Sequence, residues 1–174
     1  MRGRLSLLTG GIAGLLYAAL LVITYRLGIP AMANFLNLFT WTPLVLIPVA
    51  AGAWWLRKNE VPAPDFRALM KYALLAYLVF ELIYAVATYG LFSWHDPAAN
   101  DKLLQHLLDE KLRQLADQKA DPSRIKAIEE MADSAKGTVG LKQVVLGFGQ
   151  NLILDFFKSL LIASITKQTV QPKA

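Results

Sequence analysis

Four long stretches of the chain are almost free of charge, and this pattern predicts most of the structure. Residues 27–56 contain no charged side chain, and neither do residues 5–25. Residues 72–94 contain one and residues 143–166 contain two. A helix needs about 20 apolar residues to cross the roughly 30 Å hydrocarbon core of a bilayer. We therefore expect membrane-spanning helices over residues 5–25, 35–56, 72–94 and 143–166.

The first two predicted spans contain residues that bend a helix or allow close packing. Pro43 and Pro48 lie inside the second span, where a proline frees a backbone carbonyl and kinks the helix axis. Gly10 and Gly14 lie four residues apart in the first span, a spacing that lets a neighbouring helix approach closely. The glycine pair fits either dimerisation or packing inside the bundle. We expect packing inside the bundle, because single matches to this spacing are common.

The segment between the third and fourth spans has apolar residues at helical spacing among many charges. Asp96 with Pro97, and Asp121 with Pro122, each combine a favourable N-cap with a favourable first helical residue. We expect a helical hairpin over residues 97–136. Its apolar stripe consists of Leu104, Leu108, Leu112, Leu115, Ile125 and Ile128. Such a stripe usually forms the core between two helices, although it could also rest on the membrane surface or bind a protein.

Together these elements predict an all-α fold, an integral membrane four-helix bundle with an extracytoplasmic helical hairpin inserted between spans three and four. The composition, 55% hydrophobic over 174 residues, exceeds the apolar share of ordinary soluble domains. The net charge of +5 comes from residues that flank the spans, so we expect the lipid bilayer and not nucleic acid as their partner. The chain has no cysteine and two histidines, and we expect no metal, no cofactor and no enzymatic activity.

The basic residues also predict the orientation, because cytoplasmic flanks carry an excess of Lys and Arg. Eight basic residues would share one side of the membrane: Arg2, Arg4, Arg57, Lys58, Arg67, Lys71, Lys167 and Lys173. The other side has Arg26 and a nearly neutral hairpin. We therefore expect both termini in the cytoplasm and the hairpin outside. We also expect an uncleaved first span, because its 21 residues exceed the roughly 7–15 of a signal-peptide core.

Charged and polar residues inside the last two spans form the candidate site, because ionisable groups at membrane depth are costly and often functional. Counting from the basic flanks places polar residues of the third span level with polar residues of the fourth. The predicted pairs are Glu81 with Lys158, Tyr84 with Asp155, and Thr88 with Asn151. Each set has the spacing of one helical face. We call these six residues the polar seam, and Asp155 and Lys158 could also pair within their own helix.

The polar seam has more than one interpretation. We favour a structural role that fixes the register of two helices, because one Glu, one Asp and one Lys can largely neutralise one another. The alternative is a pathway for protons, ions or a small solute. Four spans are few for a self-contained transporter, so a pore would require a homo-oligomer. Contact with a partner protein is the third interpretation.

Short sequence features at the ends of the spans add a family resemblance. Pro64 to Phe66 leads into the third span, Tyr89 to Phe92 lies near its end, Asp96 and Pro97 open the hairpin, and residues 160–167 close the fourth span. In these features the chain resembles an uncharacterised bacterial inner-membrane family, domain of unknown function 4199. The resemblance implies four spans with a helical extracytoplasmic insert before the last span. It attaches no activity.

Two classes of function remain. The first is a structural or interaction protein whose hairpin meets an extracytoplasmic or membrane protein partner. The second is a subunit of an oligomeric transporter or channel that uses Glu81, Asp155 and Lys158. We favour the first. A dry and fully paired charged trio would support it, whereas continuous water to the trio would support transport.

Overall fold

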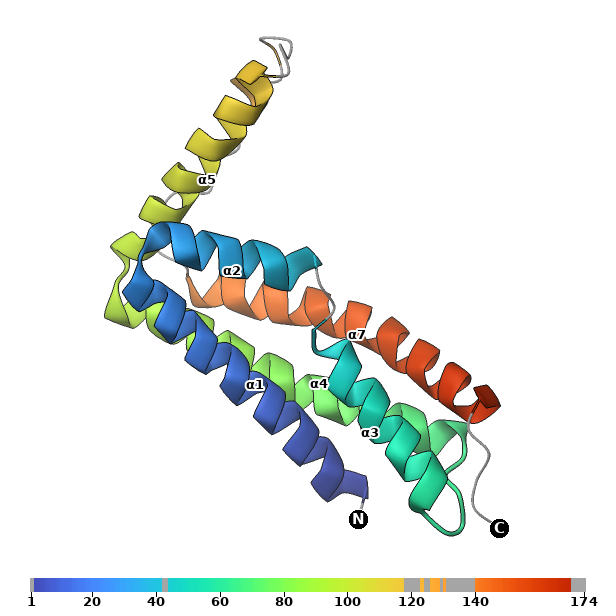
Figure 1. Cartoon of the computed structure of the whole chain (residues 1–174). Helices are drawn as coiled ribbons and strands as arrows, with labels where there is room; N and C mark the ends of the chain where they lie inside the picture. The colour runs from blue at the N-terminus through green and yellow to red at the C-terminus, as the bar shows by residue number, and fades with distance from the viewer. Residues whose placement is uncertain are drawn as a thin grey trace.

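The computed structural model describes residues 2–41, 44–117, 123, 126–128, 130 and 140–169, and every regular element among them is a helix. The helices are α1 (Arg2–Leu27), α2 (Ile29–Trp41), α3 (Leu46–Asn59), α4 (Phe66–Tyr89), the π-helical segment η1 (Gly90–His95), α5 (Ala98–Asp117) and α7 (Leu141–Thr169). Figure 1 shows α5 pointing away from the other helices, and the start of α1 and the end of α7 at the opposite end of the molecule.

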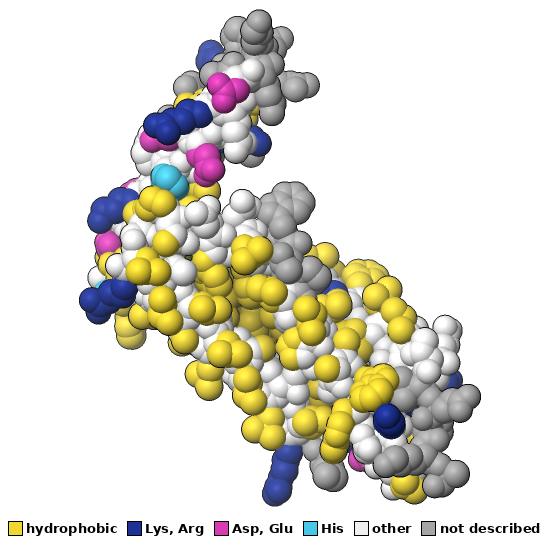
Figure 2. Space-filling model, in the orientation of Figure 1, with side chains coloured by type: hydrophobic (Ala, Val, Ile, Leu, Met, Phe, Trp, Pro, Cys, Tyr) yellow, Lys and Arg dark blue, Asp and Glu magenta, His cyan; other side chains and the backbone are white. Residues whose placement is uncertain are grey.

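Three helices are long and apolar enough to cross a membrane: Arg2–Leu27, Phe66–His95 and Leu141–Thr169. Many large apolar side chains of α1 and α7 are exposed, such as Leu15 and Phe157. In Figure 2 hydrophobic side chains cover the visible face of the bundle, and most charged side chains lie at its ends and on α5. Such a surface is costly in water and suits lipid. The protein is therefore a membrane protein.

The second predicted span, residues 35–56, is not one continuous helix. α2 ends at Trp41, residues 44–45 form a turn, and α3 begins at Leu46. Pro48 lies in the first turn of α3, where its missing N–H removes no intrahelical hydrogen bond. The prolines were expected to kink a helix, and the structure has a break instead. With 13 and 14 residues, α2 and α3 are each too short to cross a bilayer alone.

α2 also begins earlier than predicted, directly after α1. Gly28 is the only residue between the two helices, and its φ of 109° lies in the left-handed region that side-chain-bearing residues avoid. The glycine therefore allows a sharp reversal, so that α2 packs back against α1.

The predicted hairpin is described only in part. α5 supplies its first helix, on which Leu104, Leu108 and Leu112 are half-buried and Leu115 is buried. Of the second predicted helix, Ile128 is helical and half-buried. Ile125 lies outside the described residues, as does most of the rest of that helix.

α4 is the central helix, with α1 and α7 on either side of it. Gly10 and Gly14 make the α1 contact. A Cβ added at Gly10 would collide with the carbonyl oxygen of Ala76, and one at Gly14 would lie 2.8 Å from the Ile83 Cβ. The glycine pair is therefore covered by α4 of the same chain, which leaves this face unavailable to a second copy.

Tyr72 of α4 joins three helices near the end where α1 begins and α7 ends. Its side chain is buried, and its hydroxyl forms a 3.0 Å hydrogen bond with the Thr9 hydroxyl of α1. The same hydroxyl lies against Gly52 of α3, where an added Cβ would collide with it. Because residue 52 has no side chain, α3 can pack close enough to α4 for its backbone to lie against the Tyr72 hydroxyl.

Candidate functional site

The polar residues of α4 and α7 meet beside the break between α2 and α3. They line a crevice of about 340 Å³. Glu81 enters it from α4, and Asn151, Asp155 and Lys158 enter it from α7. The turn after α2 contributes Leu44 and the residues that follow it. The interrupted helix thus leaves room where a continuous span would have packed against the polar seam.

Glu81 is the buried acidic group of α4, with only 5% of its surface exposed. Its Oε2 accepts a 2.9 Å hydrogen bond from Nδ2 of Asn151 on α7. This bond links two helices across 70 positions of sequence. A buried carboxyl group needs such a donor, because burial without one is costly.

Asp155 is the most deeply buried ionisable residue of the polar seam, with 1% of its surface exposed. Its Oδ1 lies 2.8 Å from Nζ of Lys158, one turn along α7. Among the described residues, no donor reaches its second oxygen, Oδ2. One oxygen of this carboxylate therefore has a donor, and the other has none within the described part of the chain.

Lys158 reaches outward from the same turn. Its side chain is 44% exposed, and its Nζ lies 5.5 Å from the centre of the Tyr77 ring. The Tyr77 hydroxyl is buried and has no hydrogen-bond partner among the described residues. Lys158 thus neutralises Asp155 from the open side of the crevice and adds a cation–π contact.

The structure brings the predicted residues together but pairs them differently. Glu81 bonds Asn151 and not Lys158, so α7 is displaced by about two turns relative to the expected register. The reason is that counting depth from the flanking lysines assumes that both helices extend equally far beyond them. α4 begins before its flanking lysine, at Phe66, and α7 continues past its own, to Thr169. Of the expected contacts, only the pair within α7, Asp155 with Lys158, is present.

Tyr84 and Thr88 lie toward α1 and take no part in the predicted bonds. Tyr84 packs on the ring of Tyr17 at a centroid distance of 4.8 Å, and on Phe39 of α2 at 6.4 Å. Thr88 lies near the hydroxyls of Tyr17 and Tyr84 without a hydrogen bond of good geometry. Tyr84 and Phe39 therefore form an aromatic part of the crevice lining, a contact that helical spacing alone did not indicate.

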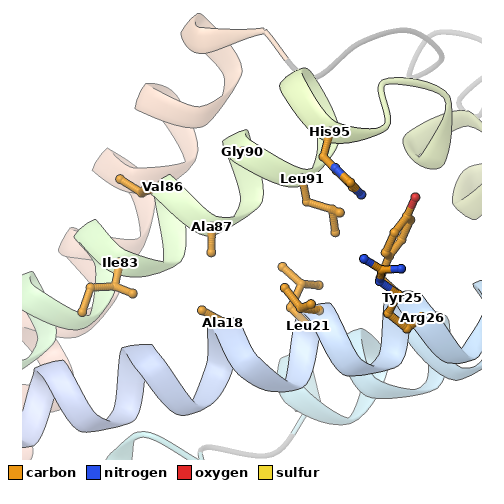
Figure 3. Close-up of a pocket in the computed structure, with 11 residues that line it drawn as sticks. Ala18, Leu21, Tyr25, Arg26, Ile83, Val86, Ala87, Gly90, Leu91 and His95 are labelled. Atoms are coloured by element: carbon orange, nitrogen blue, oxygen red, sulfur yellow. The ribbon is translucent and has the colours of Figure 1, made fainter.

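A second hollow of about 470 Å³ lies between α1 and α4, toward α5. Figure 3 shows Leu21, Ala87 and Leu91 along it, with Tyr25, Arg26 and His95 together at one end. The Tyr25 and His95 rings meet edge to face at 5.6 Å. The described residues contain no cluster of three acidic, histidine or cysteine side chains that could hold a metal ion.

The base of α5 is attached to this end of α1. Asp96 accepts a 3.0 Å hydrogen bond from the Tyr25 hydroxyl, and Lys102 lies 3.6 Å from the same carboxylate oxygen. Its other oxygen accepts from the backbone N–H of Ala98, as expected of an N-cap. Desolvation opposes ionisation of Asp96, but the Tyr25 hydrogen bond and the Lys102 charge outweigh it and lower its pKa. The partnership with Tyr25 had no local signal in the sequence.

A comparison with protein-family models identifies the family of the chain. The model described as "Protein of unknown function (DUF4199)" matches residues 8–168. The chain belongs to the DUF4199 family. No curated protein and no solved structure matches it. The DUF4199 match includes both glycines of α1, the break between α2 and α3, the polar seam and α5, and the description of the family names no activity.

Proposed function

We propose that the chain has four membrane segments, of which the second is the broken pair α2 and α3. Together they cover residues 29–59, enough for one crossing, although each is too short alone. α1, α4 and α7 supply the other three. This arrangement is a four-helix bundle in which one member is interrupted, with the hairpin inserted before the last span.

We place both termini and the loop between α3 and α4 in the cytoplasm of a bacterium, and the hairpin outside the inner membrane. Arg2 of α1 pairs with Glu60 at the end of α3, so these segments share one face. The basic flanks gather on that face, whereas α5 projects from the other. Positive flanks favour the cytoplasmic side.

In this arrangement the protein acts as an interaction protein that presents an extracytoplasmic helical arm to a protein partner. The observation that carries the proposal is the attachment of α5. Asp96 and Tyr25 join its base to α1, and Ala99 and Leu103 are buried in the same core cluster as Phe80 of α4. A helix held firmly off a membrane surface suits partner binding, because less motion has to be lost on association. The proposal includes no enzymatic activity and no cofactor.

Site-specific photo-cross-linking in native membranes tests this proposal. A photoreactive residue at exposed Arg113 of α5 should give one defined cross-linked product. The same probe at Val61, which is 75% exposed in the loop at the other end, is the matched control and should not give that product. Asp96→Ala should weaken the product from Arg113, since it loosens the arm. Identical products from positions 113 and 61 would reject a role for the arm.

A second candidate is a subunit of an oligomeric transporter or channel. The specific observation in its favour is the crevice, whose carboxylates are only partly paired. Solute or ion flux into vesicles that contain the purified protein should then fall in Asp155→Asn and stay unchanged in Asp96→Asn. Wild-type flux in Asp155→Asn as well as in Asp96→Asn would exclude a pathway through the polar seam.

A further inference from the structure

The described lining of the crevice has two carboxyl groups but only one basic group. Glu81 and Asp155 each contribute a carboxyl group, and Lys158 contributes one ammonium group. The other titratable groups that face the pair are Tyr77 and Tyr84 of α4 and Tyr17 of α1. From α2 and the start of α3 the described lining is Thr40 and apolar side chains, with no charge. If both carboxyl groups were ionised, a net charge of −1 would remain buried, which is costly at membrane depth.

The two carboxyl groups also interact with each other. Asn151 donates to Glu81 and lies one turn before Asp155 on the same face of α7, so Asp155 is presented to the same side of α4. The side chains of Glu81 and Asp155 line the same crevice, and a proton on one of them can be shared with the other. Two neighbouring carboxylates repel each other when both are ionised, and a shared proton turns the repulsion into a hydrogen bond.

Each partner has one oxygen already engaged. Oε2 of Glu81 accepts from Asn151, and Oδ1 of Asp155 accepts from Lys158. The atom without a donor is Oδ2 of Asp155, which is fully buried in the lining of the crevice. A proton carried by Glu81 would provide a donor for that atom. The same proton makes the cluster of Glu81, Asp155 and Lys158 electrically neutral.

We propose that Glu81 and Asp155 hold one proton between them, and that the crevice is a proton-binding site in the membrane. The proton resides on Glu81 and is donated to Oδ2 of Asp155, while Lys158 keeps Asp155 ionised. Lys158 is exposed at the open side of the crevice, and the proposal takes this side as the one from which the proton enters and leaves. This site stands whether or not the protein transports a solute, and it is independent of the arm.

Infrared spectroscopy of the purified protein in lipid vesicles tests the proposal, because a carboxylic acid has a C=O stretching band that a carboxylate lacks. The wild type at neutral pH should show one carboxylic acid per chain. Glu81→Gln should abolish the band. A glutamine amide can donate to Asp155 as the protonated Glu81 does, so this variant should keep the melting temperature of the wild type. Asp96→Asn, at the base of α5 and outside the lining of the crevice, should leave the band unchanged.

Either of two results would overturn the proposal. The first is a wild type without the carboxylic acid band at neutral pH, which would mean that both groups are ionised. The second is a band that persists at full area in Glu81→Gln, which would place the proton elsewhere in the chain. The wild-type measurement does not depend on how well any variant folds.

Discussion

Gly10 offers the sharpest test of how α1 packs on α4. Replacing it with alanine places a Cβ on the carbonyl oxygen of Ala76 and 3.0 Å from both the Ala76 carbonyl carbon and the Val79 Cβ. Contacts between carbon atoms are comfortable at about 3.5–4.0 Å. The obstacle is helix backbone and not a flexible side chain, so the two helices must separate. Overpacking of this kind costs about 1–3 kcal/mol, and we expect the upper part of that range for Gly10→Ala.

Gly11 is the matched control, because a Cβ added there meets nothing within 4 Å. Alanine favours a helix over glycine by about 1 kcal/mol, so Gly11→Ala should leave stability unchanged or slightly raised. Gly14→Ala should fall between the two, since it meets the Ile83 side chain, which can adjust. The free energy of unfolding in bicelles measures this order. Equal stability of Gly10→Ala and Gly11→Ala would refute the packing argument, and a loss that depends on protein concentration would point to dimerisation instead.

Three further predictions concern other contacts of the bundle and its arm. Gly52→Ala should destabilise the protein by about 1–3 kcal/mol by colliding with the Tyr72 hydroxyl, and Tyr72→Phe should recover part of that loss in a double-mutant cycle of unfolding free energies. Asp65→Ala should cost about 1 kcal/mol in the same assay, because the Asp65 side chain accepts a 2.8 Å hydrogen bond from the first turn of α4. The lowered pKa of Asp96 means that its contribution is present above the ordinary value of 3.8 and is lost as the pH falls through the lowered pKa, so spin-label distances between α5 and α1 should broaden in acid. The same distances in Asp96→Asn should already be broad at neutral pH and should not change further in acid.

Hydrophobic runs predicted the membrane helices α1, α4 and α7 well, because their period and length depend on local sequence alone. The two prolines marked the region of the second span correctly, but not the outcome. Whether a proline bends a helix or ends it depends on the neighbours that satisfy the freed backbone groups, and those neighbours are distant in sequence.

The sequence predicted which residues form the candidate site better than it predicted the contacts between them. Glu81, Asn151, Asp155 and Lys158 do meet, because their helical spacing puts each set on one face. The bond between Glu81 and Asn151 depends on the relative displacement of two long helices. That displacement depends on how α4 and α7 pack against each other along their whole length, which no count along one helix includes.

The single residue between α1 and α2 has a consequence for how the chain enters the membrane. Gly28 reverses the chain so tightly that α2 runs back against α1. In the proposed four-segment arrangement, α1 and α2 would therefore insert together as one helical hairpin, with Arg26 carried across near its tip. In that arrangement α3, which follows α2 after a short break, would complete the crossing that α2 is too short to make alone.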